Sequence, residues 1–249
     1  MSGHSKWNNI KRQKGKSDAA KGKVFTKIGR EITVCVRNSG ADINTNTKLR
    51  DLIQKAKQNN MPNDTIDRCI KKASGDMNSV DYTAINYEGY GIGGSAVIVE
   101  ALTDNKNRTA GDIRHYFDKY NGSLGTTGCV SYSFEQKGVL IIEKNEKVNE
   151  DELMMTALEA GALDVEVEED SYEVYTISND ISKVQQSLES AGYEIVSSEV
   201  SFIPQTEITL SQEQENIFKT MIEKLEDLDD VQEVYHNVCL SYDDEDDEE

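Results

Sequence analysis

The sequence predicts an α+β fold made of an N-terminal three-helix bundle with a basic arm, a discontinuous α+β middle domain and an inserted ferredoxin-like domain. Three observations predict it. Apolar residues recur at helical spacing up to about residue 75 and at strand spacing from about residue 80. Within residues 137–204 the predicted strands and helices follow one another in the order βαββαβ. We expect a disordered basic arm at 1–20, the bundle at 21–77, the middle domain at 78–136 plus 205–242, the ferredoxin-like domain at 137–204, and a disordered acidic tail at 243–249.

The bundle is predicted from three apolar stripes, each of which gives a helix one apolar face. Asn38-Ser39-Gly40 is expected to end the first helix, and Pro62 suits the first turn of the third. The stripes consist of Phe25, Ile28, Ile32 and Cys35/Val36; of Leu49, Leu52, Ile53 and Ala56; and of Ile66, Ile70 and Ala73.

The middle domain begins where the apolar period changes to that of a strand. We expect strands at 84–88 and 95–102, joined by a glycine-rich segment, then a helix at about 107–120. A further strand is expected through Val130, Tyr132 and Phe134.

The ferredoxin-like domain is predicted from the order of its elements, with strands at 138–143, 163–168, 172–177 and 194–203 and helices at 150–161 and 180–191. Gly161 and Gly192 stand where helix C-caps belong. The helix (about 211–227) and strand (231–240) that remain would leave too much apolar surface exposed alone. We therefore expect them to return and complete the middle domain.

Charge is divided unevenly along the chain. Residues 1–72 contain 17 Lys and Arg against 6 Asp and Glu, a balance of +11, whereas residues 73–249 have a balance of −30, which together give the net −19. A dense positive field favours polyphosphate partners. Trp7 and Ile10 are the only large apolar side chains among residues 1–16 apart from Met1. Trp7 either packs locally onto the first helix or stacks on a base, and the sequence leaves both open.

The expected nucleic-acid contacts are therefore the cations of the arm and the bundle, together with Trp7. They are Lys6, Trp7, Lys11, Arg12, Lys14, Lys16, Lys21, Lys23, Lys27, Arg30, Lys55, Lys57, Arg68, Lys71 and Lys72.

Composition argues against several other classes. The four cysteines are scattered without a CxxC pair, and the three histidines have no metal-ligand spacing with them, so we expect free thiols, a reducing cytoplasm and no metal or other cofactor. No apolar run approaches a membrane span, and the N-terminus lacks the apolar region of a secretory signal, so we expect no membrane partner.

Two motifs near the start of the middle domain allow more than one interpretation. Gly89-x-Gly91-x-x-Gly94 matches the spacing of the dinucleotide fingerprint, but it leads into a β-branched strand instead of a helix, which favours a turn between antiparallel strands. Polar and basic residues at the start of the 107–120 helix indicate either an anion-binding rim at the helix N-terminus or simple capping of the helix. Its residues are Asn105, Asn107, Arg108 and Thr109. No catalytic constellation stands out, so we expect no enzyme.

Several segments resemble the YebC/PmpR family over essentially the whole chain. Ile92 departs from them, because the family usually has proline after Tyr-Gly. The segments are Gly3-His4-Ser5-Lys6-Trp7, Ile10-Lys11, Lys21-Gly22-Lys23, Phe25-Thr26-Lys27, Asn60-Met61-Pro62, Tyr87-Glu88-Gly89-Tyr90-Gly91, Leu102-Thr103-Asp104-Asn105, Asn107-Arg108-Thr109, Ala157-Leu158-Glu159-Ala160-Gly161-Ala162, Ile203-Pro204-Gln205-Thr206 and Val234-Tyr235-His236-Asn237.

The resemblance implies three domains with a discontinuous middle one and a cytoplasmic, DNA-binding transcriptional regulator without agreed catalytic residues. It equally implies a second reading, a ribosome-associated translation factor that relieves stalling at proline runs. We therefore expect a nucleic-acid-binding regulator of gene expression whose partners are DNA or ribosomal RNA, with basic ribosomal proteins as further partners. A nucleotide-dependent enzyme built on the 89–94 glycine loop is the remaining alternative.

Overall fold

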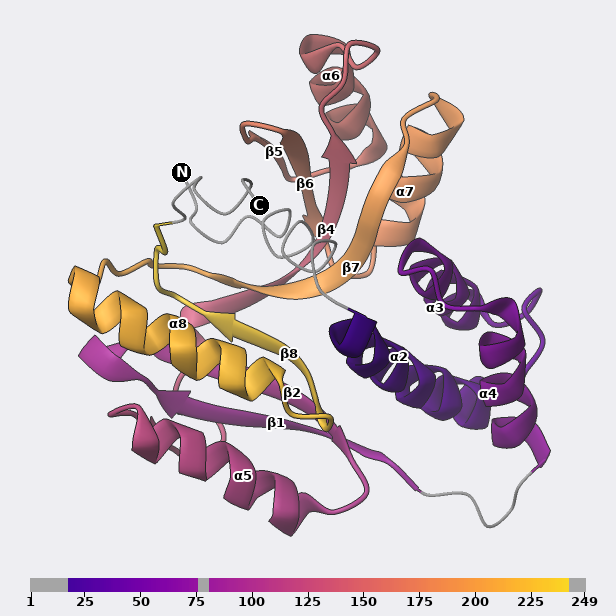
Figure 1. The fold of residues 1–249 in the computed structure, drawn as a ribbon. Helices are drawn as coiled ribbons and strands as arrows, with labels where there is room; N and C mark the ends of the chain where they lie inside the picture. The colour runs from indigo at the N-terminus through magenta and orange to yellow at the C-terminus, as the bar shows by residue number, and fades with distance from the viewer. Residues whose placement is uncertain (1–17, 76–80, 242–249) are drawn as a thin grey trace. The chain divides into compact units, whose positions relative to one another are not determined.

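The computed structural model describes residues 18–75 and 81–241, and its ribbon is shown in Figure 1. These residues divide into two compact units. One contains residues 18–130 (apart from 76–80) and 210–236, and the other contains 131–209 and 237–241. Across the described residues, helices and two antiparallel sheets confirm the expected α+β class, while the three-domain bounds stay a prediction.

The first unit opens with helices α2 (Asp18–Ser39), α3 (Thr47–Gln58) and α4 (Asn63–Gly75). Their apolar stripes pack on one another as expected, with Ile32, Leu49 and Ala56 completely buried. Gly40 ends α2 in the left-handed conformation (φ 84°), with its N–H donating to the carbonyl of Val36 at 2.7 Å. The three helices therefore form a bundle with a core of its own.

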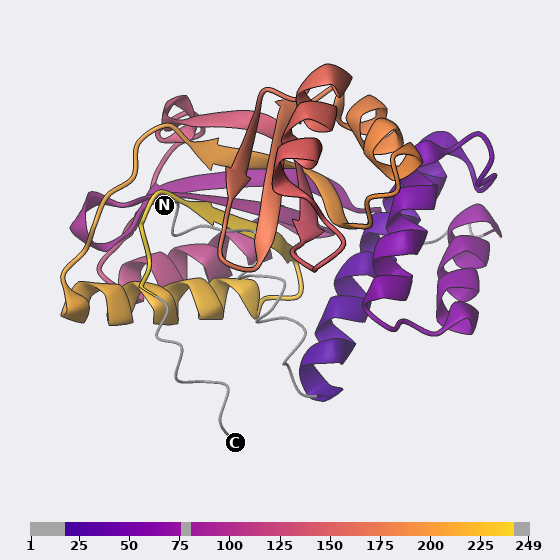
Figure 2. The ribbon, with the colours of Figure 1, turned by 90° about the horizontal axis from the view of Figure 1, so that it is seen from above.

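The same unit contains a four-stranded antiparallel sheet in the order β3-β1-β2-β8. Its strands are β1 (Thr83–Tyr90), β2 (Ala96–Thr103), β3 (Ser123–Leu124) and β8 (Val231–His236). Helices α5 (Lys106–Lys119) and α8 (Gln212–Glu226) lie side by side on one face of the sheet (Figures 1 and 2). β8 pairs with β2, with Ile98 opposite Tyr235, so the C-terminal helix and strand complete a sheet begun more than 100 residues earlier.

The second unit contains a sheet in the order β5-β6-β4-β7, with two helices in the βαββαβ sequence. The elements are β4 (Phe134–Glu143), α6 (Glu150–Ala160), β5 (Asp164–Val167), β6 (Ser171–Ile177), α7 (Ile181–Ser190) and β7 (Ile195–Pro204). Leu140 and Val174 of the sheet pack with Leu153 of α6 and Leu188 of α7. Gly161 caps α6 at φ 107°, as the sequence predicts.

Two predicted strands were wrong in extent. Residues 131–133 form a single 3-10 turn, and Phe134 instead begins the long strand β4, so no separate strand runs through Val130 and Tyr132. The C-terminal strand ends at His236 instead of 240, and Val238 forms only an isolated bridge to Ile208. The short strand β3 was not predicted, because two residues are too few to show a period.

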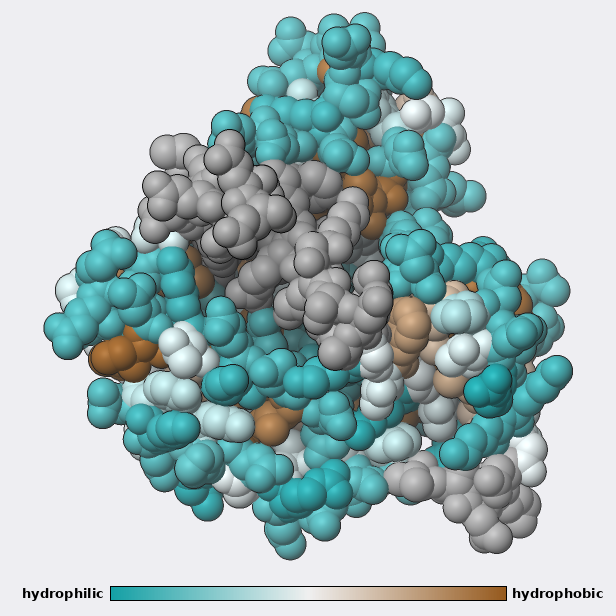
Figure 3. All heavy atoms as spheres, in the orientation of Figure 1, coloured by the Kyte–Doolittle hydropathy of each residue, from teal (hydrophilic) through white to brown (hydrophobic). Residues whose placement is uncertain are grey.

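The surface drawn in Figure 3 is mostly hydrophilic, with hydrophobic residues confined to small separate patches. No helix within the described ranges is long and apolar enough to cross a membrane.

Candidate nucleic-acid interface

The predicted nucleic-acid contacts fall on different parts of the structure. Three of them, Lys23, Lys27 and Arg30, lie on α2, and Lys21 belongs to the first turn of that helix. Lys55 and Lys57 lie on α3, and Arg68, Lys71 and Lys72 lie on α4. Six lie outside the described residues and stay predictions: Lys6, Trp7, Lys11, Arg12, Lys14 and Lys16.

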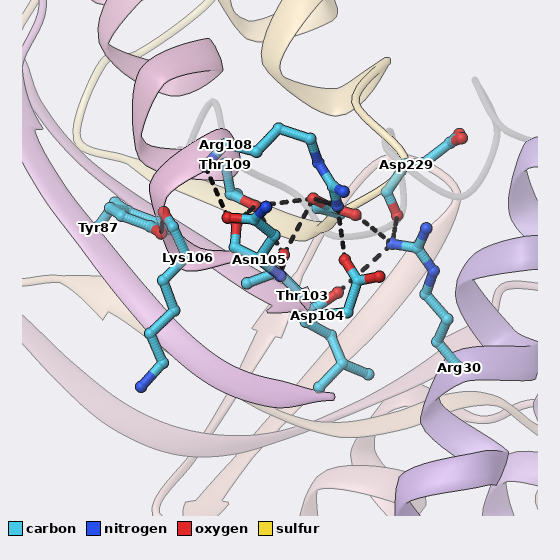
Figure 4. A network of polar contacts seen from close by, with 11 residues as sticks. Arg30, Tyr87, Thr103, Asp104, Asn105, Lys106, Arg108, Thr109 and Asp229 are labelled. Atoms are coloured by element: carbon cyan, nitrogen blue, oxygen red, sulfur yellow. Dashed lines mark hydrogen bonds and ion pairs between the residues drawn. The ribbon is translucent and has the colours of Figure 1, made fainter. Parts of the chain in front are cut away.

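The α2 cations contact the turn between α8 and β8. Lys23 forms an ion pair with Asp227 at 3.0 Å, and Lys27 donates to the carbonyl of Glu226 at 2.8 Å. Arg30 donates through Nη1 to the carbonyl of Asp229 and to Oδ1 of Asp230, both at 2.6 Å (Figure 4). Because these cations are three and four residues apart, they share one face of α2.

Asp230 is the centre of a buried polar network, and its side chain is only 10% exposed. Figure 4 draws the network and labels the donors Arg30, Thr103, Arg108 and Thr109. Its Oδ2 accepts from Arg108 Nη2 and Thr109 Oγ1, each at 2.7 Å, and from Thr103 Oγ1 at 3.1 Å. Its own carbonyl accepts from the N–H of Leu102 at 2.7 Å. The network thus joins α2, the end of β2, the start of α5 and the turn before β8.

These bonds decide the charge of the carboxylate. Burial on its own raises the pKa of Asp230, but hydrogen bonds from Arg108, Thr109, Arg30 and Thr103 to the charged form outweigh it and lower the pKa to about 2. Asp230 is therefore a permanent anion at neutral pH, and it holds two arginines.

Three of the four residues of the expected anion rim form hydrogen bonds in or beside this network. Asn105 caps α5 by accepting from the N–H of Arg108 at 3.1 Å, and Arg108 also pairs with Asp104 at 2.8 Å. Arg108 and Thr109 donate to Asp230, while Asn107 is exposed. The chain's own carboxylate thus lies where an anion was expected, and a site for a free anion stays a prediction.

The cations of α3 and α4 are placed differently from those of α2. Lys55 pairs with Glu31 at 3.5 Å. Lys57, Arg68, Lys71 and Lys72 are all exposed, and their side chains form no ion pair or hydrogen bond within the described part of the chain. The three on α4 line one shallow hollow together with two carboxylates, those of Asp64 and Asp67.

The glycine-rich segment is the turn between β1 and β2, as its β-branched continuation predicts. Gly93 and Gly94 adopt φ of 69° and 78°, which favours glycine. A Cβ on Gly89 would lie 2.7 Å from the carbonyl oxygen of Ser123, so this glycine lets the backbone of β3 approach β1. The turn leads into the strand β2, whereas the dinucleotide fingerprint opens a helix whose N-terminus receives the pyrophosphate, so the structure agrees with the turn that the sequence favours.

Glu88, beside that turn, is buried, and its carboxylate accepts from the N–H groups of Gly128 at 2.8 Å and Val130 at 3.0 Å. It therefore fixes the loop that leads out of the first unit. Among the residues that the structure describes, no group of three His, Cys, Asp or Glu side chains could hold a metal ion.

Comparison with known proteins decides the family. Residues 5–76 match the TACO1/YebC protein N-terminal domain, and residues 82–238 match the TACO1/YebC second and third domain. The chain belongs to the TACO1/YebC family. The expected resemblance is therefore confirmed, and it extends over both described ranges.

Members of the TACO1/YebC family resemble the chain along nearly its full length. A "Probable transcriptional regulatory protein" of Acetivibrio thermocellus is 58% identical over 95% of this chain and 98% of its own length. One of Thermoanaerobacter pseudethanolicus is 50% identical over 100% of both. The crystal structure of a conserved hypothetical protein from Aquifex aeolicus superposes with a TM-score of 0.84 at 39% identity, covering 92% of this chain and 94% of that one.

Sequence reasoning missed Asp230. Part of the signal was present in the rim, since Arg108 and Thr109, like the nearby Thr103, are donors that need an acceptor in the folded chain. Its source lies 121 residues beyond Thr109, where no periodicity could indicate it.

Proposed function

We propose that this chain is a cytoplasmic, non-enzymatic regulator of gene expression that binds DNA through the cations of its arm and bundle. The observation that carries the proposal is the α4 cluster, in which Arg68, Lys71 and Lys72 are exposed around one hollow without an ion pair or hydrogen bond in the described chain. Cations that form no ion pair or hydrogen bond within the described chain are available to phosphate oxygens.

The names of the relatives support the regulatory part of this proposal, since they are called probable transcriptional regulatory proteins. The uneven charge supports the place of contact, because the excess of cations lies in residues 1–72. We propose further that the bundle is one domain, that the sheet completed by β8 is a second, and that the βαββαβ unit is a third, ferredoxin-like domain that contacts proteins.

Binding to a fluorescent DNA duplex of about 20 base pairs, measured by anisotropy over a range of salt concentrations, tests the proposal. In the test variant Arg68, Lys71 and Lys72 are changed to Gln. We expect it to bind roughly tenfold or more weakly, with a salt slope lower by about 2 to 3 in log–log terms, because each phosphate that is no longer neutralised removes about 0.9.

A matched control removes three exposed cations from the acidic part of the chain, Arg114, Lys147 and Lys183, each changed to Gln. Both variants lower the charge equally, so a general charge effect would weaken them alike. Equal affinity of the α4 variant and the wild type would contradict the proposal.

A second candidate function is favoured by the balance of −30 in residues 73–249. A DNA duplex repels such a surface, whereas a ribosome offers both phosphates and basic proteins. A ribosome-associated translation factor would co-sediment with ribosomes at moderate salt, and Lys-to-Glu changes in the arm would release it. The same changes would slow the synthesis of reporter proteins that contain runs of proline. Sedimentation only at the top of the gradient, with selective binding to one promoter fragment, would exclude this second function.

A further inference from the structure

The turn between α8 and β8 presents a row of oxygen acceptors to one face of α2. The acceptors belong to Glu226, the last residue of α8, and to the turn Asp227-Leu228-Asp229-Asp230 that follows it. Along α2, Lys23 contacts the carboxylate of Asp227 and Lys27 contacts the carbonyl of Glu226. Arg30 contacts the carbonyl of Asp229 and the carboxylate of Asp230. Four anionic or partly negative oxygens thus meet three cations over two turns of helix, as successive phosphate oxygens would.

The contacts are graded along the helix. The Lys23–Asp227 pair is open to solvent, with side chains 46% and 52% exposed. The Arg30–Asp230 pair is nearly closed, at 16% and 10%. Exposed ion pairs contribute little and exchange readily, whereas a buried, multiply bonded pair is costly to break. The outer end of the row is therefore the part that a competing anion displaces first.

Asp227 has a second cationic neighbour, Lys224 at 3.9 Å, in the last turn of α8. If the turn left α2, Lys23 and Lys27 would be separated from these acceptors, whereas Lys224 would stay beside Asp227. Displacement would thus expose both lysines of α2 at once, and these would add to the cations of α4 that are already exposed.

We propose that the α8–β8 turn occupies a phosphate-binding face of α2 and that nucleic acid competes with the turn for that face. The inference rests on the proposed nucleic-acid binding and adds that a segment of the same chain competes with the nucleic acid. In the free protein the outer contacts of the turn lower the affinity of the bundle for phosphate. Bound nucleic acid displaces the turn at Asp227 and leaves the Asp230 end in place.

The test compares two single substitutions that remove the same charge. Asp227→Asn removes the carboxylate that Lys23 and, at a longer distance, Lys224 contact, whereas Asp118→Asn removes an exposed carboxylate of α5 that forms no ion pair with a described cation of α2. We expect Asp227→Asn to bind a duplex of about 20 base pairs roughly 1.5- to 5-fold more tightly than Asp118→Asn, the range that corresponds to one exposed ion pair. Asp118→Asn should melt at the temperature of the wild type, and Asp227→Asn should melt at most about 2 to 4 °C lower, because it loses one exposed ion pair.

Hydrogen–deuterium exchange of the wild type provides a second readout. With saturating duplex, we expect faster exchange in residues 226–229 and slower exchange in α2. Equal affinity of the two variants, or exchange in 226–229 that stays constant or slows on binding, would overturn the competition while leaving the α4 contacts intact. Failure of every variant to bind either the duplex or an RNA hairpin would overturn both the proposed function and the competition.

Discussion

The cations of α2 and those of α4 look alike in the sequence and differ in the structure. Arg30 contacts a buried carboxylate at 2.6 Å, whereas Arg68, on the exposed side of α4, makes no hydrogen bond or ion pair in the described chain. An arginine that is already bonded on several sides stabilises the fold, and an arginine without internal bonds is available to a partner. The position of acceptors in space, and not local charge density, distinguishes these roles.

The strongest test of this difference removes the anion of the internal network. We expect Asp230→Ala to lower the free energy of unfolding by about 3 to 5 kcal/mol, because it leaves the buried end of Arg30 and two threonine hydroxyls without this acceptor. Urea denaturation measures it. Asp104→Ala, which removes only an exposed pair with Arg108, should cost less than about 1 kcal/mol. Equal decreases would mean that Asp230 is not the centre of the network.

The next largest effect is expected for the arm, where substitutions should lower the affinity for nucleic acid without lowering the stability of the fold. Changing Lys11, Arg12, Lys14 and Lys16 together to Ala should flatten the salt slope of nucleic-acid binding by about 0.7 to 0.9 for each phosphate that the arm no longer neutralises. The melting temperature should hardly change, since the sequence there offers little to bury. An unchanged slope at unchanged affinity would exclude the arm from the contact surface.

The internal network also predicts a dependence on pH. Asp230 has its pKa lowered from 3.8 to about 2, so its contribution to stability is complete above the unfolded value and is lost as the pH falls through the folded value. We therefore expect the stability advantage of the wild type over Asp230→Asn to be constant above about pH 5 and to shrink between about pH 4 and pH 2. An advantage that does not vary over this range would show that Asp230 has an ordinary pKa.

The smallest effect is expected at the outer contact of α2. Lys23→Gln should lower the free energy of unfolding by less than about 1 kcal/mol, because its pair with Asp227 is exposed on both sides. A decrease of several kcal/mol in urea denaturation would mean that the outer contact holds the fold as firmly as Arg30 does, and the graded row would be wrong.

Local patterns explain which parts of the fold were predictable. The stripe that contains Ile28 and Ile32 follows from the helical period alone, and both side chains are buried. The start of β4 was hidden because Glu135 and Gln136 are both exposed, which interrupts strand alternation. Neighbouring residues determine a helix, but pairing partners distant in the sequence determine where a strand starts.

The candidate site was predictable only as a set of cations. The sequence indicated that Arg30 and Arg68 belong to one basic region, and it contained no sign that Asp230 would bind Arg30 and not Arg68. Such a contact between residues 200 positions apart depends on the return of β8 to β2. Pairing across that distance leaves no periodic signal in the sequence. Only the structure shows that the cations of α2 are bonded internally whereas those of α4 are exposed.

The most direct test of this division is thermal unfolding with and without a DNA duplex, for two triple variants of equal charge. Arg68, Lys71 and Lys72 changed to Gln should melt like the wild type and show a smaller rise in Tm with the duplex. Lys23, Lys27 and Arg30 changed to Gln should melt about 5 to 10 °C lower without any ligand, because the Asp230 network is then deprived of the Arg30 donor. Equal Tm values for the two free variants, or a full duplex-induced rise in the α4 variant, would contradict the account.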